Sequence, residues 1–257
     1  MINRNYSIIY VGIFFIKNSL QIIMTTNLKI VALIPARSGS KGIINKNIKL
    51  YKGIPLLAHS IKSGLSSIYI NEVYVSTDCV EYGNISSEYG AKIIIRPSQF
   101  SDDLSPDIDT FNHFINELTL NNIEIPDLII HLRPTYPNRS IELIDKCIKT
   151  FIDNYNNYDS LRTVVKFDKT PYKMYTIEND NLIPIIKNYN NIIEPFNQAR
   201  QIFPDTYLHN GCIDIIKTES LKNNNLLSGN NIFPFIMDEN EINDIDNLND
   251  FIKSENK

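Results

Sequence analysis

The sequence predicts an α/β fold with a doubly wound, mainly parallel sheet. Apolar runs alternate with segments of helical spacing from residue 29 to residue 167. The run KIVALIP at residues 29–35 is apolar without interruption, as strands buried on both faces are. The segment PLLAHSIKSGL places Leu57, Ile61 and Leu65 on one helical face. Strands and helices that alternate in this way form parallel sheets with helices on both sides.

The elements that follow keep this alternation. Further strands rich in Val, Ile or Leu are expected at residues 72–78, 91–97, 127–135 and 160–167. Further amphipathic helices are expected at residues 80–90, with Gly90 at the end, at 107–120, with Asp107 as N-cap, and at 140–155. A chain of 257 residues fits one large α/β domain or two small ones, and we assign one domain to residues 25–257.

Charge and cysteine content narrow the function classes. The formal net charge is −4, whereas domains that coat nucleic acid are strongly basic, so no nucleic-acid partner is expected. Cys79, Cys147 and Cys212 are widely spaced and form no C-x-x-C pair. This pattern is typical of reduced residues and favours a cytoplasmic location over a disulfide framework or a zinc site.

Residues 1–24 are interpreted as an N-terminal extension. The apolar stretch YSIIYVGIFFI lies between Arg4 and Lys17 and resembles a short signal segment, but it is too short for a comfortable membrane span. Met24 lies just before the first expected strand, so we favour an upstream extension over a targeting segment. No other segment is apolar and long enough to span a membrane, and no membrane partner is expected.

Three of the expected strands end in arginine. In doubly wound sheets, ligands bind outside the carboxyl ends of the strands. Four of these ends read Pro35-Ala36-Arg37, Ser76-Thr77-Asp78, Arg96-Pro97 and Arg133-Pro134-Thr135. One such arginine is most simply a solvated loop cation. Three that converge by topology indicate an anionic ligand, because guanidinium groups bind phosphate and carboxylate in a fixed geometry.

The stretch IPARSGSKGIINKNI at residues 34–48 has the composition of a phosphate-binding loop. Gly39 and Gly42 permit backbone turns that other residues resist, and the N–H groups of such turns form an anion nest. It is not a Walker A loop, because Lys41 is followed by Gly42, and it is not G-x-G-x-x-G. The cations around the nest are Arg37, Lys41 and Lys46.

The order of the motifs from about Lys29 to the C-terminus resembles the acylneuraminate cytidylyltransferase family, which comprises the CMP-sialic acid synthetases and their relatives. The motifs are the loop at 34–48, VSTD at 75–78, RP at 96–97 with Asp102 and Asp103, LRPTYPNR at 132–139, RQIFPDTYLHNG at 200–211 and DID at 244–246. The resemblance implies a fold of the nucleotide-diphospho-sugar transferase type. It also implies transfer of CMP from CTP to the 2-hydroxyl of a sialic-acid-like nonulosonic acid, with release of pyrophosphate.

The resemblance implies a role for each matching residue. The nucleotide side comprises Arg37, Ser40, Lys41, Lys46, Asn47, Arg96 and Ser105, of which Lys46 also counts as catalytic. The acid-sugar side comprises Arg133 and Arg200, and Arg200 matches an arginine essential to the family. Asp244 and Asp246 match carboxylates that bind Mg²⁺, and their spacing puts both on one face of an extended segment. The group that takes the hydroxyl proton stays open between a metal-bound water and Asp244. His209 is a candidate for the wall of the sugar pocket.

The chain departs from the family pattern at several positions. Ile43, Ile44 and Asn45 replace a common Leu-Pro-Arg, PTYPNR replaces PTSPLR, and Asn247 replaces a Thr after DID. Arg133 replaces a common glutamine that faces the acid sugar. This last change leaves the sugar open among N-acetylneuraminate, legionaminate, pseudaminate and less common acids.

Residues 166–206 interrupt the alternation of strands and helices. YKMYTI at 172–177 and LIPII at 182–186, joined by ENDN, predict a hairpin. The resemblance implies a dimerisation arm that reaches the neighbouring subunit, and hence a homodimer. The alternative is a flap over the protomer's own pocket.

Two other functions fit parts of the sequence. A glycosyltransferase of related fold also uses a D-x-D metal site, but there it usually follows a mid-chain strand, and here it lies near the C-terminus. A non-catalytic nucleotide-binding protein is the alternative of a different class. The presence of the arginines, lysines and aspartates that the resemblance implies speaks against it.

Overall fold

The protein is described here by a computed structural model that covers residues 28–102, 104–238, 244–245 and 247–255. The expected extension at residues 1–24 lies outside the described residues. None of the helices in the described ranges has the length and apolar character needed to cross a membrane.

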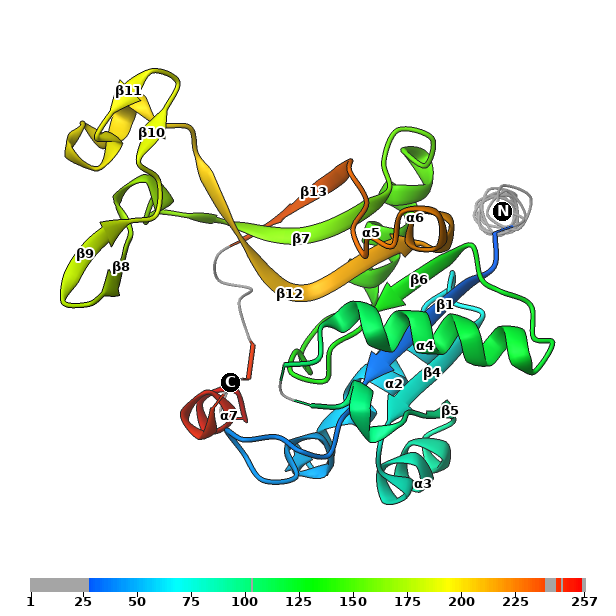
Figure 1. Ribbon diagram of the computed structural model, residues 1–257. Coiled ribbons are helices and arrows are strands. Elements are labelled where there is room, and N and C mark those ends of the chain that lie inside the picture. The colour runs from blue at the N-terminus through cyan, green and yellow to red at the C-terminus, as the bar shows by residue number, and fades with distance from the viewer. Residues whose placement is uncertain (1–27, 103, 239–243, 246, 256–257) are drawn as a thin grey trace, which may run out of the picture.

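The centre of the fold is a seven-stranded sheet of order β13-β7-β12-β6-β1-β4-β5 (Figure 1). Its strands are β1 (Ile30–Pro35), β4 (Glu72–Thr77), β5 (Lys92–Ile95), β6 (Leu128–His131), β7 (Ser160–Phe167), β12 (Thr206–Lys217) and β13 (Ile232–Met237). Neighbours from β5 to β6 pair in parallel, as does β13 with β7, whereas β12 is antiparallel to both β6 and β7. The predicted mainly parallel sheet is confirmed, and β12 and β13 are additions that the sequence pattern did not predict.

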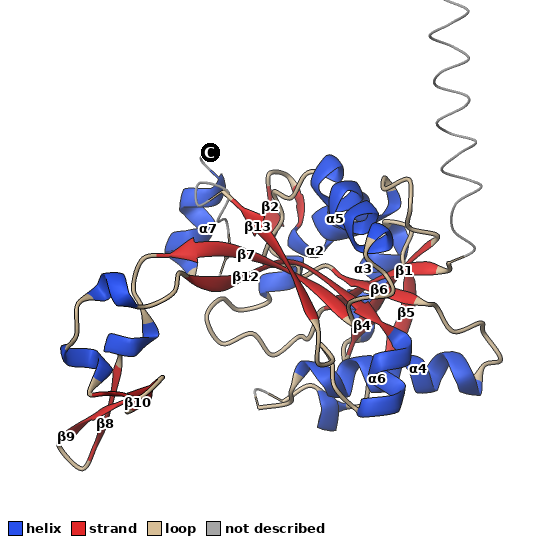
Figure 2. Ribbon diagram, turned by 90° about the horizontal axis from the view of Figure 1, so that it is seen from above, coloured by secondary structure: helices blue, strands red, loops and turns tan. Residues whose placement is uncertain are grey.

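Helices cover both faces of the sheet (Figure 2). They are α2 (Leu56–Leu65), α3 (Val80–Glu88), α4 (Asp107–Leu120), α5 (Ile141–Asp153) and α6 (Thr218–Asn224). The last helix, α7 (Leu248–Glu255), packs in a separate apolar cluster. Alternate residues of β1 face opposite sides: Ala32 packs in a core with α2 and α5, and Leu33 packs in a core with α4. Burial on both faces explains why this strand is apolar at every position.

The helix boundaries follow local signals, with one correction. Ser140 caps α5 by accepting a hydrogen bond from the Leu143 N–H at 3.1 Å. Gly90 takes a φ of 93° just beyond α3, as expected of a residue that ends a helix. Asp107 is not the N-cap of α4: Pro106 holds that position, and Asp107 is the first helical residue. Its carboxylate contacts Arg133 instead.

The insertion expected at residues 166–206 leaves the sheet where β7 and β12 are paired, at Phe167 and Thr206, and extends away from it (Figure 1). The predicted hairpin is present as β8 (Tyr175–Glu178) and β9 (Asn181–Pro184). Its two turn residues, Asn179 and Asp180, both have positive φ, as a type I′ turn requires. A second, unpredicted hairpin joins β10 (Asn188–Tyr189) to β11 (Ile192–Ile193).

Short elements complete the described chain. The strands β2 (Leu50–Tyr51) and β3 (Ile54–Pro55) form a small antiparallel pair. Single 3₁₀ turns lie at Lys46–Ile48, Ser98–Phe100, Pro171–Lys173, Pro195–Asn197 and Arg200–Ile202.

The C-terminal segment packs against the residues that follow β1. Ile245 and Phe251 pack with Ile43, Tyr51 and Leu56 in a separate apolar cluster. The buried Tyr51 hydroxyl donates to the Ser254 carbonyl and accepts from Asn138 Nδ2, both at 2.7 Å. Tyr51 thereby ties α7 to the segment that follows β6.

Replacing Tyr51 with Phe should lower the free energy of unfolding by about 1–3 kcal/mol, because buried polar groups of Asn138 and Ser254 lose a partner. Urea denaturation followed by circular dichroism measures the change. Tyr175→Phe, at a partly exposed position on the arm, is the control and should change stability by less than about 0.5 kcal/mol. Equal stability of Tyr51→Phe and wild type would contradict a stabilising role of the Tyr51 hydroxyl hydrogen bonds.

Candidate active site

A pocket of about 510 Å³ opens at the carboxyl edge of the sheet. It is lined by Pro35, Arg37, Ser40, Lys41, Gly42, Lys46, Asn47, Arg96, Phe100, Ser101, Asp102, Ser105, Asp107, Thr110, His131, Arg133, Pro134 and Thr135. All seven residues expected on the nucleotide side line this pocket, together with Arg133. The strand-end arginines Arg37, Arg96 and Arg133 therefore converge as the topology predicted.

The loop after β1 is held by side chains rather than by glycine geometry. The Asp78 carboxylate, from the end of β4, accepts hydrogen bonds from the Ser38 N–H and hydroxyl, both at 2.8 Å. Asn47 is buried and donates to the Arg37 carbonyl at 2.9 Å. The turn role expected of Gly39 is corrected: its φ is not positive, and the left-handed residue is Asn45 (φ 53°).

Arg96 fixes the opposite wall of the pocket. Its side chain is buried and donates to the hydroxyls of Ser101, at 3.0 Å, and Thr110. Burial lowers the pKa of the Arg96 guanidinium, and the charge of Asp78 partly offsets that effect. The group stays charged, because arginine begins from a very high pKa. A buried cation whose donors meet neutral hydroxyls suits a site for an anion.

Lys46 connects the loop to the C-terminal segment. Its ammonium donates to the Ile245 carbonyl at 3.1 Å, and the Ile245 N–H donates to the Thr135 carbonyl at 2.9 Å. Two pocket-lining residues thus hold the backbone next to Asp244. The second expected metal ligand, Asp246, lies outside the described residues. Within the described ranges, no group of three or more His, Cys, Asp or Glu side chains is arranged to hold a metal ion.

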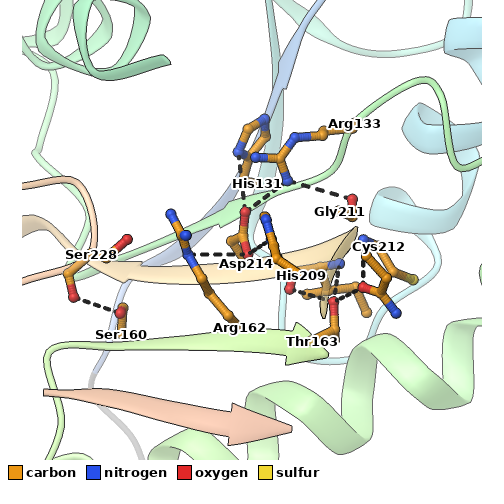
Figure 3. Close-up of polar contacts among 12 residues, drawn as sticks. His131, Arg133, Ser160, Arg162, Thr163, His209, Gly211, Cys212, Asp214 and Ser228 are labelled. Carbon is orange, nitrogen blue, oxygen red and sulfur yellow. Dashed lines mark hydrogen bonds and ion pairs between the residues drawn. The ribbon is translucent and has the colours of Figure 1, made fainter. Parts of the chain in front are cut away.

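Arg133 lies between two carboxylates, of which Figure 3 shows Asp214. Its Nη1 is 2.7 Å from Asp214 Oδ2, and its Nη2 is 3.1 Å from Asp107 Oδ2. Asp214 is almost fully buried and also bonds His209 Nε2 at 2.8 Å. Burial alone would raise the pKa of the Asp214 carboxyl, but the His209 hydrogen bond and the Arg133 charge hold it below its usual range.

His131 borders the same wall as a neutral group. Its ring is buried, with Nδ1 at 3.7 Å from Asp214 Oδ2, beyond hydrogen-bonding distance. Burial lowers the pKa of His131 to about 3, and the Arg133 charge acts in the same direction. The imidazole is therefore uncharged at neutral pH.

The structure does not bring Arg200 into this pocket. Arg200 lies at the base of the arm, in a separate hollow of about 520 Å³ lined in part by Lys166, Phe203 and Asp205. Its Nη2 is 3.5 Å from Asp168 Oδ1, and about half of its side chain is exposed. His209 is likewise not among the lining residues of the main pocket, because its ring is turned to Asp214.

Sequence reasoning missed Asp107, Thr110 and His131 as lining residues. His131 stands two positions before Arg133 in an expected strand, and this position near a strand end was a usable signal. Asp107 was interpreted as a helix cap. Its contact with Arg133 depends on how α4 sits against the sheet, which the local sequence does not show.

Comparisons with known proteins agree with this geometry. Residues 31–182 match the family model described as cytidylyltransferase. The chain is 28% identical over 229 residues to N-acylneuraminate cytidylyltransferase of Escherichia coli O18:K1:H7. This alignment covers 87% of this chain and 50% of the relative. It is 31% identical over 228 residues to post-translational flagellin modification protein B of Campylobacter coli, which covers 87% of this chain and 92% of the relative. The chain thus spans half the length of the first relative and most of the second.

A solved structure shares the fold. CMP:2-keto-3-deoxy-manno-octonic acid synthetase complexed with CTP matches with a TM-score of 0.64 at 17% identity, over 89% of this chain and 97% of the other. At this identity the likeness concerns the fold. The family match extends over more than half of the sequence, and its segment carries every residue that lines the pocket. From the matched segment and the Campylobacter relative, we conclude that this chain belongs to the cytidylyltransferase family, as the order of its motifs predicted.

Proposed function

We propose that the protein transfers CMP from CTP to the anomeric 2-hydroxyl of a sialic-acid-like nonulosonic acid and releases pyrophosphate. The observation that carries this proposal is the single pocket in which Arg37, Lys41, Lys46 and Arg96 lie at the carboxyl edge of the sheet. A triphosphate brings about four negative charges, so the main demands on such a site are charge neutralisation and in-line positioning. The name of the E. coli relative supports the choice of substrates.

The nucleotide is proposed to lie between the loop after β1 and the wall that Arg96 fixes. Arg37, Ser40, Lys41 and Lys46 would hold the triphosphate, and Lys46 would remain close to the reacting phosphate. Asn47 and Arg96 would contact the nucleoside, and Ser105 would help to read the cytosine. These roles are supported by the common lining of one pocket.

Asp244 and Asp246 are proposed to hold Mg²⁺. Carboxylate oxygens are ligands that this ion prefers, and the bonds of Ile245 to Lys46 and Thr135 keep the Asp244 backbone beside the pocket. When bound, Mg²⁺ supplies positive charge that stabilises the phosphates during displacement. The protein's own contribution is to hold the lysine and the carboxylate segment in one place.

A homodimer is also part of the proposal. Large apolar side chains on the arm hairpins are exposed: Ile177 by 76%, Leu182 by 61% and Ile193 by 75%. Several exposed apolar side chains on one projecting element are typical of a surface that another chain covers. Arg200 lies away from the pocket of its own chain, which supports an arm that completes the site of a second copy and disfavours a flap over the chain's own pocket.

A cytoplasmic location is proposed on the state of the cysteines. Cys79, Cys147 and Cys212 are all free thiols, and two of them are buried. Free thiols in all three positions fit a reducing compartment.

The defining experiment is pyrophosphate release with CTP, Mg²⁺ and a panel of nonulosonic acids. We expect turnover with at least one acid, and at least about tenfold lower turnover with UTP, because a site that pairs the cytosine amine leaves buried polar groups unpaired with uracil. Comparable rates with CTP and UTP would argue for a different nucleotidyltransferase. Transfer of the sugar from a nucleotide sugar to an acceptor would favour a glycosyltransferase, and CTP binding without turnover would favour a non-catalytic protein.

Asp246→Asn should remove most turnover while CTP still binds, because the front loop holds phosphate independently of the carboxylates. Pyrophosphate release gives turnover, and calorimetry gives CTP affinity. Asp153→Asn, on the exposed end of α5, is the control and should match wild type. Undiminished turnover of Asp246→Asn would refute the metal assignment.

Arg200→Ala should lower kcat/KM by at least about tenfold and leave CTP affinity nearly intact, whereas Arg37→Ala should weaken CTP binding. If the arm acts on a second copy, an equal mixture of the two impaired variants forms mixed dimers with one complete site. Such a mixture should regain about a quarter of wild-type activity, as random pairing in a twofold dimer requires. No recovery on mixing would place Arg200 in its own chain's site or outside catalysis.

A further inference from the structure

Two arginines of the pocket, the buried Arg96 and the partly buried Arg133, have different surroundings. Arg96 donates to the neutral hydroxyls of Ser101 and Thr110. Arg133 instead forms ion pairs with Asp107 and Asp214, and 22% of its side chain is exposed. The first guanidinium keeps its net charge toward a ligand. The second is accompanied by two negative charges within hydrogen-bonding distance.

The carboxylate behind Arg133 is built into the sheet. The strand register puts Asp214 of β12 directly between His131 of β6 and Arg162 of β7. Residues paired in this way point to the same face, so the three polar side chains form one row. Arg162 Nε is 3.8 Å from Asp214 Oδ1 (Figure 3). A buried carboxylate held from several sides cannot swing away to release Arg133.

The carboxylate in front of Arg133 belongs to the pocket itself. Asp107 is the first residue of α4, where a negative charge is favoured by the helix dipole, and half of its side chain is exposed. A sugar carboxylate that approached Arg133 would meet Asp107 beside it. Like charges at such distances repel strongly where water is partly excluded. A neutral oxygen would meet no such penalty.

We propose that Arg133 is a specificity-determining residue that binds a neutral oxygen of the sugar, a hydroxyl or an amide carbonyl, and not its carboxylate, with Asp107 and Asp214 as positioning residues. The inference rests on the proposed function. A guanidinium has five N–H groups, more than these two carboxylates and the Gly211 carbonyl use, so Arg133 can still donate into the pocket. The sugar carboxylate then needs a different cation.

The first test compares an acid sugar with an analogue in which a carboxamide replaces the C1 carboxylate. With saturating CTP, Arg133→Gln should raise both the KM of the acid and the inhibition constant of the amide. The two factors should agree within about threefold, well below the tenfold gap that corresponds to roughly 1.4 kcal/mol. The preference among acids that differ in ring substituents should change, with kcat little affected. A loss for the acid that exceeds the loss for the amide by more than about threefold would overturn the proposal.

The second test removes the front carboxylate. Asp107→Asn leaves the buried Asp214 in place and changes the local charge of Arg133 and its carboxylates from negative to neutral, so the acid should gain at least about threefold over the amide relative to wild type. The gain should vanish in the double variant Asp107→Asn/Arg133→Gln. A purely structural effect of Asp107 would weaken both ligands equally, and an unchanged acid-to-amide ratio would overturn its positioning role.

A third measurement needs no sugar. By calorimetry, Arg133→Gln should keep the Kd for CTP within about threefold of wild type, whereas Arg37→Gln should weaken it at least about tenfold, or roughly 1.4 kcal/mol. Equal losses would place Arg133 among the phosphate cations and overturn the inference. If wild type released no pyrophosphate with any acid sugar, the proposed function would fail, and the CTP affinities would still decide the role of Arg133.

Discussion

The constraint on which the site depends is the mutual repulsion of cations gathered at one edge of the sheet. The parallel strands bring Arg37, Arg96 and Arg133 together by topology, and the loop adds Lys41 and Lys46. Such a cluster is stable only if each side chain is fixed by oxygen atoms or by a bound anion. Among the oxygens that the described part of the fold provides are the hydroxyls of Ser101 and Thr110, the Ile245 carbonyl and the carboxylates of Asp107 and Asp214.

The two sides of the pocket differ in the kind of oxygen that accepts from each arginine. Hydroxyls satisfy the donors of Arg96 without cancelling its charge, so that wall keeps its attraction for phosphate. Two carboxylates more than offset the charge of Arg133, so that wall offers directional donors without a net positive field. Discrimination between sugars rests on hydrogen bonds that the wrong substrate leaves unmade, and a neutralised, fixed guanidinium is suited to that task.

The sequence was sufficient for whatever depends on local pattern. Burial on both faces makes β1 apolar throughout, and the position of Arg37 and Arg96 after parallel strands places both at one edge. The row formed by His131, Asp214 and Arg162 was beyond such reasoning. It depends on the register of β12, an antiparallel strand that enters the sheet only after the arm. The hairpin at Asn179 was predictable because it depends on local turn residues. The position of Arg200 outside the pocket was not, because it depends on tertiary structure.

The arm and the Arg133 side of the pocket are connected to the same pair of strands, β7 and β12. Strands β7 and β12 carry Arg162 and Asp214 at their buried end and the paired residues Phe167 and Thr206 where the arm departs. The register of this pair shifts between His209 and Asp214, and such an irregularity bends a strand and separates two paired stretches. The phosphate loop, by contrast, is fixed by Asp78 at the end of β4. The arm and Asp214 therefore share β12, whereas the loop after β1 is anchored by a strand nearer the other end of the sheet.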